Sequence, residues 1–137
     1  MDPTATDGDT ALVDETAYES STPQRGDVIV FATQEASGSR TLIKRVVALP
    51  GQTIEYHNCS LFIDGELVPE QYVDLALMDG ICGADQATLT LPADQYFTMG
   101  DNRGGSRDSR DLGPIRITDI VGRVTAVIDA TGAERQL

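Results

Sequence analysis

Lys44 is the residue with the clearest capacity for chemistry, because it is the only lysine among ten basic residues. It lies in the apolar run of residues 41–49, whose β-branched and aliphatic side chains predict a strand. Side chains alternate between the two faces of a strand, so its neighbours on the same face are Leu42, Val46 and Ala48. Burial among them would lower the pKa of the ammonium group, and a neutral lysine can act as a general base. The alternative is an edge strand from which the ammonium group reaches the solvent.

Residues 100–111 form the second chemical candidate, with three glycines, three aspartates, three arginines and two serines. Aspartate and arginine two residues apart can form bidentate pairs that stiffen a loop, here Asp101 with Arg103 and Asp108 with Arg110. The hydroxyls of Ser106 and Ser109 could orient a neighbouring group. The arginines argue against a calcium loop, and without a following lysine or an expected helix the segment is not a phosphate-binding loop. The alternative is a solvated turn with weak surface ion pairs.

His57, the only histidine, lies two residues before Cys59. Both side chains would share one face of a strand without converging, so a Cys–His nucleophile is disfavoured. The other cysteine is Cys82. These residues do not supply the four ligands of a structural zinc site, and the sequence predicts no metal and no other cofactor. A disulfide outside the cytoplasm and two buried thiols both fit the two cysteines.

The net charge disfavours several kinds of partner. The 137 residues include 22 acidic and ten basic side chains, which gives a formal charge of −12 at pH 7. Such a chain repels phosphates and anionic lipids, so neither nucleic acid nor a charged lipid surface is expected to bind by charge. The length predicts one domain, residues 1–137. No run reaches the roughly 18 apolar residues of a spanning helix, and the first residues lack the pattern of a secretory signal.

The elements that must position the lysine are predicted to be strands. Short apolar runs between turn residues are expected as strands at 10–14, 28–31, 41–49, 53–56, 61–63, 66–68, 96–99 and 120–128. Asp64 and Gly65 predict a two-residue hairpin. Loops are expected at 34–39 and 70–92, and a polar tail at 129–137. The pattern predicts an all-β fold of coiled antiparallel sheets with a partly open barrel, and a sandwich fits nearly as well.

Four separated segments resemble the sequence boxes of bacterial type I signal peptidases. They are Met1-Asp2-Pro3-Thr4, the Arg-Gly-Asp segment 25–31, the lysine segment 44–51, and Gly100-Asp101-Asn102-Arg103 followed by Ser106 and Asp108-Ser109-Arg110. Their order and separation agree across almost the whole chain. The resemblance implies the fold that signal peptidases share with LexA, and a Ser–Lys endopeptidase that removes signal peptides from secretory precursors. Together the four segments outweigh two alternatives given above, a solvent-exposed Lys44 on an edge strand and a solvated turn at residues 100–111.

The resemblance assigns roles to particular residues. Lys44 would be the general base, and Ser106 would hydrogen-bond to its amine and orient it. Asp108 and Arg110 would pair and brace this arrangement. The substrate would bind extended along the lysine strand, and the residues that would line its site are Met1, Ala5, Leu42 and Ile43.

In the family, the nucleophilic serine directly precedes the Met-x-Pro-Thr segment, so it is expected before Met1, with a membrane anchor upstream. Residues 1–137 are therefore expected to be an inactive fragment of the extracytoplasmic domain of a cell-membrane protein, with signal peptides as its partners. Two alternatives remain. One is a catalytically dead binding module derived from a peptidase, and the other is a LexA-like self-cleaving domain, which the acidic charge disfavours.

Two further expectations follow from the resemblance. An extracytoplasmic location favours a disulfide between Cys59 and Cys82, which lie in residues 57–92, the expected variable insertion that caps the domain. Gly104 and Gly105 stand where many relatives have a more polar pair, and this exchange is expected to loosen the loop.

Overall fold

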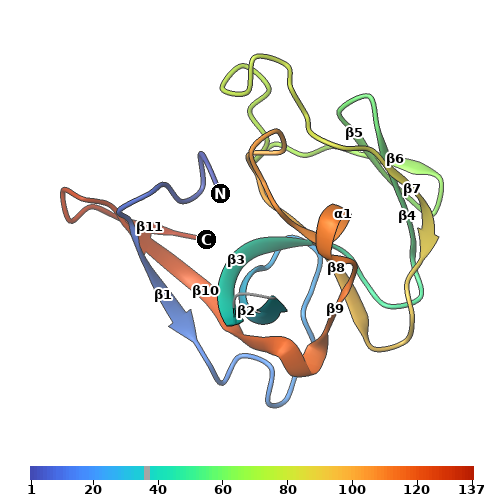
Figure 1. Cartoon of the computed structure of the whole chain (residues 1–137). Coiled ribbons are helices and arrows are strands. Elements are labelled where there is room, and N and C mark those ends of the chain that lie inside the picture. Colours follow the sequence, from blue (N-terminus) through green and yellow to red (C-terminus); the bar gives the residue numbers. More distant parts are fainter. Residues whose placement is uncertain (36–37) are drawn as a thin grey trace.

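The structure is a computed structural model that describes residues 1–35 and 38–137 (Figure 1). Its strands are β1 (Thr10–Asp14), β2 (Val28–Glu35), β3 (Gly38–Ala48), β4 (Thr53–His57), β5 (Ser60–Ile63), β6 (Glu66–Val68), β7 (Gln86–Thr90), β8 (Gln95–Met99), β9 (Ile115–Arg116), β10 (Ile120–Ile128) and β11 (Glu134–Gln136). Two short helical turns accompany them, α1 (Ser109–Leu112) and η1 (Ile117–Asp119). The all-β prediction is confirmed.

Two antiparallel sheets build the fold. The larger sheet has the order β1-β10-β2-β3-β8-β9, and β11 also pairs with β10. The smaller sheet has the order β6-β5-β4-β7, and Figure 1 shows it on the side of β8 away from β1 and β10. The end strands β1 and β9 do not pair with each other among the described residues, so the larger sheet coils without closing into a barrel.

The β2–β3 hairpin is longer than predicted. Its pairing runs from Val28 opposite Arg45 to Glu35 opposite Gly38. Most of the loop expected at 34–39 is therefore strand, and residues 36–37 lie outside the described part of the chain. The ladder continues because backbone hydrogen bonds do not need the apolar alternation from which strands were predicted.

Three short strands were missed by the sequence analysis. β7 lies inside the expected loop at 70–92, β9 follows α1, and β11 lies in the expected polar tail at 129–137. The tail folds back because the Asp129 Oδ1 accepts the amides of Thr131 and Ala133, at 2.8 and 3.1 Å. This turn brings β11 onto β10, although the sequence of β11 is entirely polar.

A bulge in β3 ends the predicted alternation of side chains. Val46 pairs with Thr98 and Ala48 with Phe97, so Val47 is the extra residue. Ala48 consequently packs in the same apolar cluster as Val47, whereas the sequence analysis placed it on the face of Val46. The bulge places both Val47 and Ala48 in one apolar cluster. This cluster joins the two sheets through Val47, Ala48, Ile54, Tyr56, Leu61, Phe97 and Met99.

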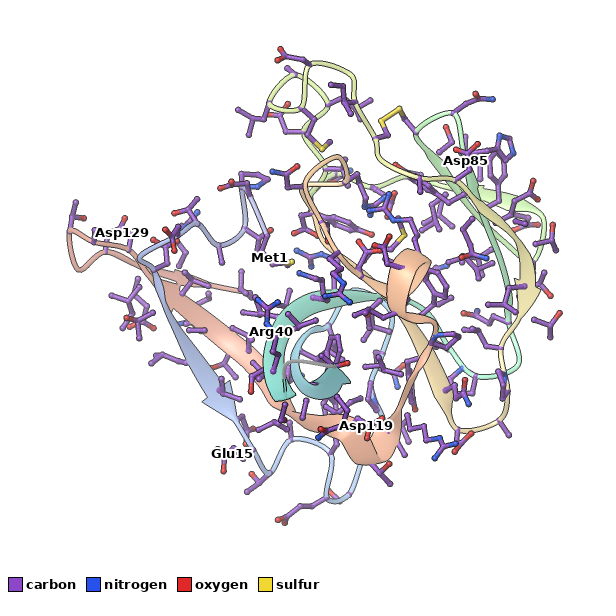
Figure 2. The ribbon with its side chains drawn as sticks, in the orientation of Figure 1. Met1, Glu15, Arg40, Asp85, Asp119 and Asp129 are labelled. Carbon is purple, nitrogen blue, oxygen red and sulfur yellow. A yellow bond between two sulfur atoms is a disulfide. The ribbon has the colours of Figure 1, made fainter. Side chains whose placement is uncertain are left out.

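The segment between β4 and β7 packs against the loop that follows β8. The two-residue hairpin is confirmed, because Ile63 pairs with Glu66 and the φ angles of Asp64 and Gly65 are 52° and 80°. A disulfide joins Cys59 to Cys82, the two residues expected to be bonded, and Figure 2 shows it as a yellow bond. We call residues 69–84 the excursion, and the disulfide ties its end to the smaller sheet.

We expect the disulfide to contribute substantially to stability. The bond closes a loop between residues 23 positions apart. By lowering the conformational entropy of the unfolded chain, it should add about 3 kcal/mol to the free energy of unfolding. The Cys59→Ala/Cys82→Ala variant should lose that much unfolding free energy in urea titrations. Mass spectrometry after alkylation without reductant should show no modified cysteine in the parent. Two alkylated thiols would contradict the bond.

Candidate active site

Gly100 lies between Lys44 and Ser106. Arg45 on β3 pairs with Met99 at the end of β8, so the next residue along the chain reaches Lys44. A Cβ atom placed on Gly100 would lie 2.2 Å from the Ser106 Oγ and 3.7 Å from the Lys44 Cδ. Only glycine therefore leaves room for the Ser106 hydroxyl, and the backbone at this point brings the two side chains together.

Lys44 has the surroundings of a lysine that gives up its proton easily. Burial lowers the pKa of its ammonium group below the ordinary 10.5, and the carboxylates of Asp108 and Asp101 partly oppose that shift. Within the described residues, its Nζ has neither a hydrogen bond nor an ion pair. The pKa of the Met1 amino group is lowered by burial and then by the charge of Lys44. The start of the chain thus lies within electrostatic range of this lysine.

The Ser106 hydroxyl is buried, and no partner in the described part of the chain has full hydrogen-bond geometry, although the hydroxyl lies near enough to Asp108 to help lower the pKa of that carboxyl. A buried hydroxyl without a partner is costly, and such groups are uncommon outside functional sites. The predicted hydrogen bond between Ser106 and the Lys44 amine is not made among the described residues, although both side chains lie beside Gly100.

Asp108 and Arg110 form the pair that their spacing predicts. Arg110 donates its Nε and Nη2 to the two carboxylate oxygens of Asp108, each at 2.9 Å. Asp108 also accepts the Gly100 amide at 3.0 Å. Burial raises the pKa of the Asp108 carboxyl, but Arg110 and this amide outweigh it, so the net pKa is lowered. The Asp108–Arg110 pair therefore fixes the Gly100 backbone, beside which the Lys44 and Ser106 side chains both lie.

A helical turn begins inside the loop, where the sequence analysis expected none. Asp108 caps α1 by accepting the Arg110 amide at 3.2 Å. The Ser109 Oγ accepts the Thr98 amide at 2.9 Å and lies 3.1 Å from the Thr98 hydroxyl. Ser109 thus holds α1 against β8, and the aspartate that pairs with Arg110 also starts the helix.

The sequence analysis predicted that Asp101 pairs with Arg103, and this prediction is wrong. Arg45 donates its Nε and Nη2 to the carboxylate of Asp101 at 3.0 and 2.8 Å. Arg103 instead donates to both carboxylate oxygens of Glu70. Loop residues two apart point in directions set by the backbone, and here each finds a partner far along the chain.

The N-terminal segment is attached to the same loop. The Thr4 hydroxyl donates to Asp101, and Arg45 donates to the Thr4 Oγ1 at 3.1 Å and to the Gly26 carbonyl at 2.8 Å. Residues from three of the four resembling segments therefore meet Arg45. Figure 2 shows Met1 on the side of this segment that faces β3.

Comparison with known proteins agrees with this geometry. Residues 1–128 match the family described as signal peptidase, peptidase S26. The chain is 34% identical over 139 residues to signal peptidase I V of Bacillus subtilis strain 168, covering 91% of this chain and 78% of that protein. The chain belongs to the S26 signal peptidase family.

Other members of the S26 signal peptidase family are similarly related. Signal peptidase IB of Staphylococcus aureus strain COL is 33% identical over 138 residues, which cover 91% of this chain and 71% of that protein. The crystal structure of a signal peptidase I from Enterococcus faecalis V583 aligns with a TM-score of 0.65 and 32% identity, over 76% of this chain and 97% of that chain. The family recognised from the four segments is confirmed. No helix among the described residues is long and apolar enough to cross a membrane.

The four expected substrate-lining residues of this signal peptidase family member separate into two groups. Met1, Ala5 and Ile43 pack together against one apolar cluster, built on Val28, Val124 and Val127. Leu42 packs against a different cluster, which includes Phe31 and Val46. The first three could line a common apolar surface beside Lys44, whereas Leu42 does not pack with them.

His57 is engaged elsewhere in the smaller sheet. Its ring stacks on Phe62 with centroids 4.8 Å apart, and its Nε2 lies 3.2 Å from Glu55. Gly104 also differs from expectation. Its Cβ would lie 2.4 Å from the Ile81 carbonyl, so glycine at this position allows close packing of the excursion rather than loosening the loop.

Sequence analysis missed Glu70 and Tyr72, which contact the arginines of the site. Tyr72 lies beneath the Arg45 guanidinium at 4.1 Å, and Glu70 pairs with Arg103. Both residues lie in a segment interpreted only as a loop. Glu70 and Tyr72 stand two positions apart in the sequence, but nothing local indicated which arginine each would contact.

Proposed function

We propose that this protein is a serine endopeptidase of the signal peptidase I type, which removes signal peptides from secretory precursors. In this proposal residues 1–137 form one extracytoplasmic domain of a cell-membrane protein, and residues 57–92 form its variable cap. The observation that carries the proposal is a lysine with a lowered pKa beside the Met1 amine, where the residue before Met1 would bring a hydroxyl.

The proposed reaction uses one proton acceptor. The serine hydroxyl directly before Met1 attacks the scissile carbonyl while the neutral Lys44 Nζ takes its proton. The resulting ammonium group then donates that proton to the departing amine, which leaves an acyl-enzyme ester. Lys44 next takes a proton from water as the water attacks the ester, and returns it to the serine. Lys44 acts as base and acid in turn, so its pKa must lie near the working pH.

The substrate is proposed to bind as an additional strand. β8 pairs with β3 only from Arg45 to Ala48, while β2 occupies the other edge of β3. The β3 edge before Arg45 therefore has no described strand partner on the β8 side, and an extended peptide can pair there. Met1, Ala5 and Ile43 would line pockets for the small side chains that precede a signal-peptide cleavage site. Leu42 remains a candidate only for contacts along the strand.

The function is tested by placing serine directly before Met1 in residues 1–137. We expect this chain to cleave a peptide carrying a small-x-small motif, and the same chain with alanine before Met1 to bind it without cleavage. The rate should rise with pH as Lys44 loses its proton, because only the neutral amine accepts one. Binding without cleavage by the serine form would support the dead binding module instead. Cleavage of the chain itself alone would support the LexA-like alternative.

Ser106→Ala should lower kcat of the serine-bearing chain by about ten- to a hundredfold, which is less than the whole contribution of a general base. The reason is that the amine loses the hydroxyl proposed to orient it, while Gly100 and Asp108 stay in place. Ser20→Ala, at an exposed position, is the matched control and should keep the parent rate. A parent rate in Ser106→Ala would remove the orienting role.

A further inference from the structure

Glu70 reaches from the excursion into the loop that carries Ser106. Its two carboxylate oxygens accept the Nη1 and Nη2 of Arg103 at 2.6 and 2.5 Å. The exposed fraction of the side chain is 0% for Arg103 and 7% for Glu70, so water does not screen the pair. A buried charge depends strongly on its partner, because leaving it unpaired costs several kcal/mol. Arg103 therefore depends on the Glu70 carboxylate to hold this position.

Arg103 in turn fixes the backbone between the two candidate catalytic side chains. Its Nε donates to the Gly100 carbonyl at 3.0 Å. Gly100 is the residue whose Cα faces both the Ser106 hydroxyl and the Lys44 side chain. Asp108 holds the amide of this glycine, and Arg103 holds its carbonyl. The peptide groups on both sides of Gly100 are thus fixed by charged side chains.

Tyr72 extends this contact to the other arginine of the site. Its hydroxyl donates to the Glu70 Oε1 at 2.7 Å, and its ring lies 4.1 Å from the Arg45 guanidinium carbon. Arg45 pairs with Asp101, next to Gly100 in sequence. Glu70 and Tyr72 therefore contact the two arginines that hold the neighbouring residues Gly100 and Asp101.

The excursion is packed closely against the loop at a second place. A Cβ on Gly83 would lie 2.5 Å from the Arg103 carbonyl oxygen, and the Arg110 Nη1 donates to the Cys82 carbonyl at 2.7 Å. The disulfide at Cys82 anchors this part of the excursion to the smaller sheet. Glu70 thus projects from a segment whose far end is anchored at Cys82.

We propose that Glu70 is a positioning residue for the general base: by holding Arg103 on the Gly100 carbonyl, it sets the place where Lys44 and Ser106 meet. The inference rests on the proposed role of Lys44, but it concerns a residue outside the four resembling segments. It also gives the cap a function in the reaction, because the cap supplies the counterion that orders the loop.

Two physical effects of removing the Glu70 charge have opposite signs. Loss of a negative charge, by itself, lowers the pKa of a nearby ammonium group. Loss of positioning raises the pKa of Lys44. Without its counterion, Arg103 moves toward the solvent, water enters beside Gly100, and Lys44 is less buried. The direction of the change therefore distinguishes a positioning role from simple electrostatics.

The single lysine makes the measurement direct. In residues 1–137 grown with 13C-labelled lysine, the one side-chain Cε signal reports the protonation of Lys44, and Lys44→Arg confirms its assignment. Glu70→Gln should raise the pKa of Lys44 by about one unit toward its ordinary value. Glu66→Gln, an exposed carboxylate in the neighbouring strand, is the control and should leave it unchanged. A folded Glu70→Gln protein with an unchanged or lowered pKa of Lys44 would overturn the proposal.

Tyr72→Phe tests the positioning role of Glu70 if the Glu70→Gln variant does not fold. This change removes only the hydrogen bond to Glu70 and keeps the ring beneath Arg45, so it should raise the pKa of Lys44 in the same direction by a smaller amount. No change in folded Tyr72→Phe would then contradict the proposal. Because the titration needs neither serine nor substrate, it stands apart from the cleavage test. In the serine-bearing chain, Glu70→Gln should also move the pH–rate profile to higher pH.

Discussion

Lys44→Met in the serine-bearing chain should lower cleavage of a small-x-small peptide by about a thousandfold or more. Methionine has nearly the length of lysine and fills the same apolar surroundings, but it cannot accept a proton. Lys44 is the only lysine of the sequence, and the arginines of the site stay protonated, so they cannot replace the lost base. The measurement is kcat/KM of the parent and the variant at a pH where the rate of the parent no longer rises.

The same substitution should not destabilise the fold. The pKa of Lys44 is lower in the folded protein than in the unfolded chain, so the unfolded chain binds more protons between these two values. Stability consequently rises with pH across that interval, and at lower pH the charged lysine opposes folding. Lys44→Met should therefore keep or raise the melting temperature at neutral pH. Turnover near the parent rate in a folded Lys44→Met protein would remove Lys44 from the mechanism.

Asp101→Asn is expected to have the largest effect on stability, about 3–5 kcal/mol, because it leaves Arg45 buried without its counterion. Asp101 is completely buried, and Arg45 has only 11% of its side chain exposed. For a domain of this size the loss should lower the melting temperature by roughly 10–20 °C. The Thr4 contact weakens as well, so the segment that begins at Met1 should lose its attachment to the loop.

Asp85→Asn is the matched control for this measurement. Asp85 is exposed and lies far from Met1 in Figure 2, so the same change of charge should leave the melting temperature unaltered. A melting temperature of Asp101→Asn within about 3 °C of the parent would show that the Arg45 pair contributes little. Amide hydrogen exchange near residue 4 provides the second readout, and it should accelerate only in Asp101→Asn.

Local patterns in the sequence predicted the parts of the site whose geometry is local. The strand carrying Lys44 follows from its apolar composition, and the Asp108–Arg110 pair follows from two residues at the start of one helical turn. The partners of Asp101 and Arg103 were not predictable in this way. They lie 56 and 33 positions away, and they meet only after β3, β8 and the excursion have packed.

In the fold too, local patterns predicted the features that depend on neighbouring residues and missed those that depend on distant partners. Apolar alternation located most of the strands of the larger sheet, but it failed at Val47, where one extra residue shifts Ala48 to the other face. A bulge depends on the partner strand, so a single sequence carries no reliable signal for it. The polar β11 was missed for a related reason, since it is stabilised by the Asp129 turn and by backbone pairing.

The three buried ion pairs also affect how whole molecules behave toward one another. Arg45, Arg103 and Arg110 neutralise Asp101, Glu70 and Asp108 inside the protein. Of 22 acidic and ten basic residues, this leaves 19 acidic against only seven basic outside these pairs. Neighbouring molecules therefore repel each other at neutral pH and low salt. That repulsion disappears near the isoelectric point of about 4.2, where colloidal self-association becomes favourable.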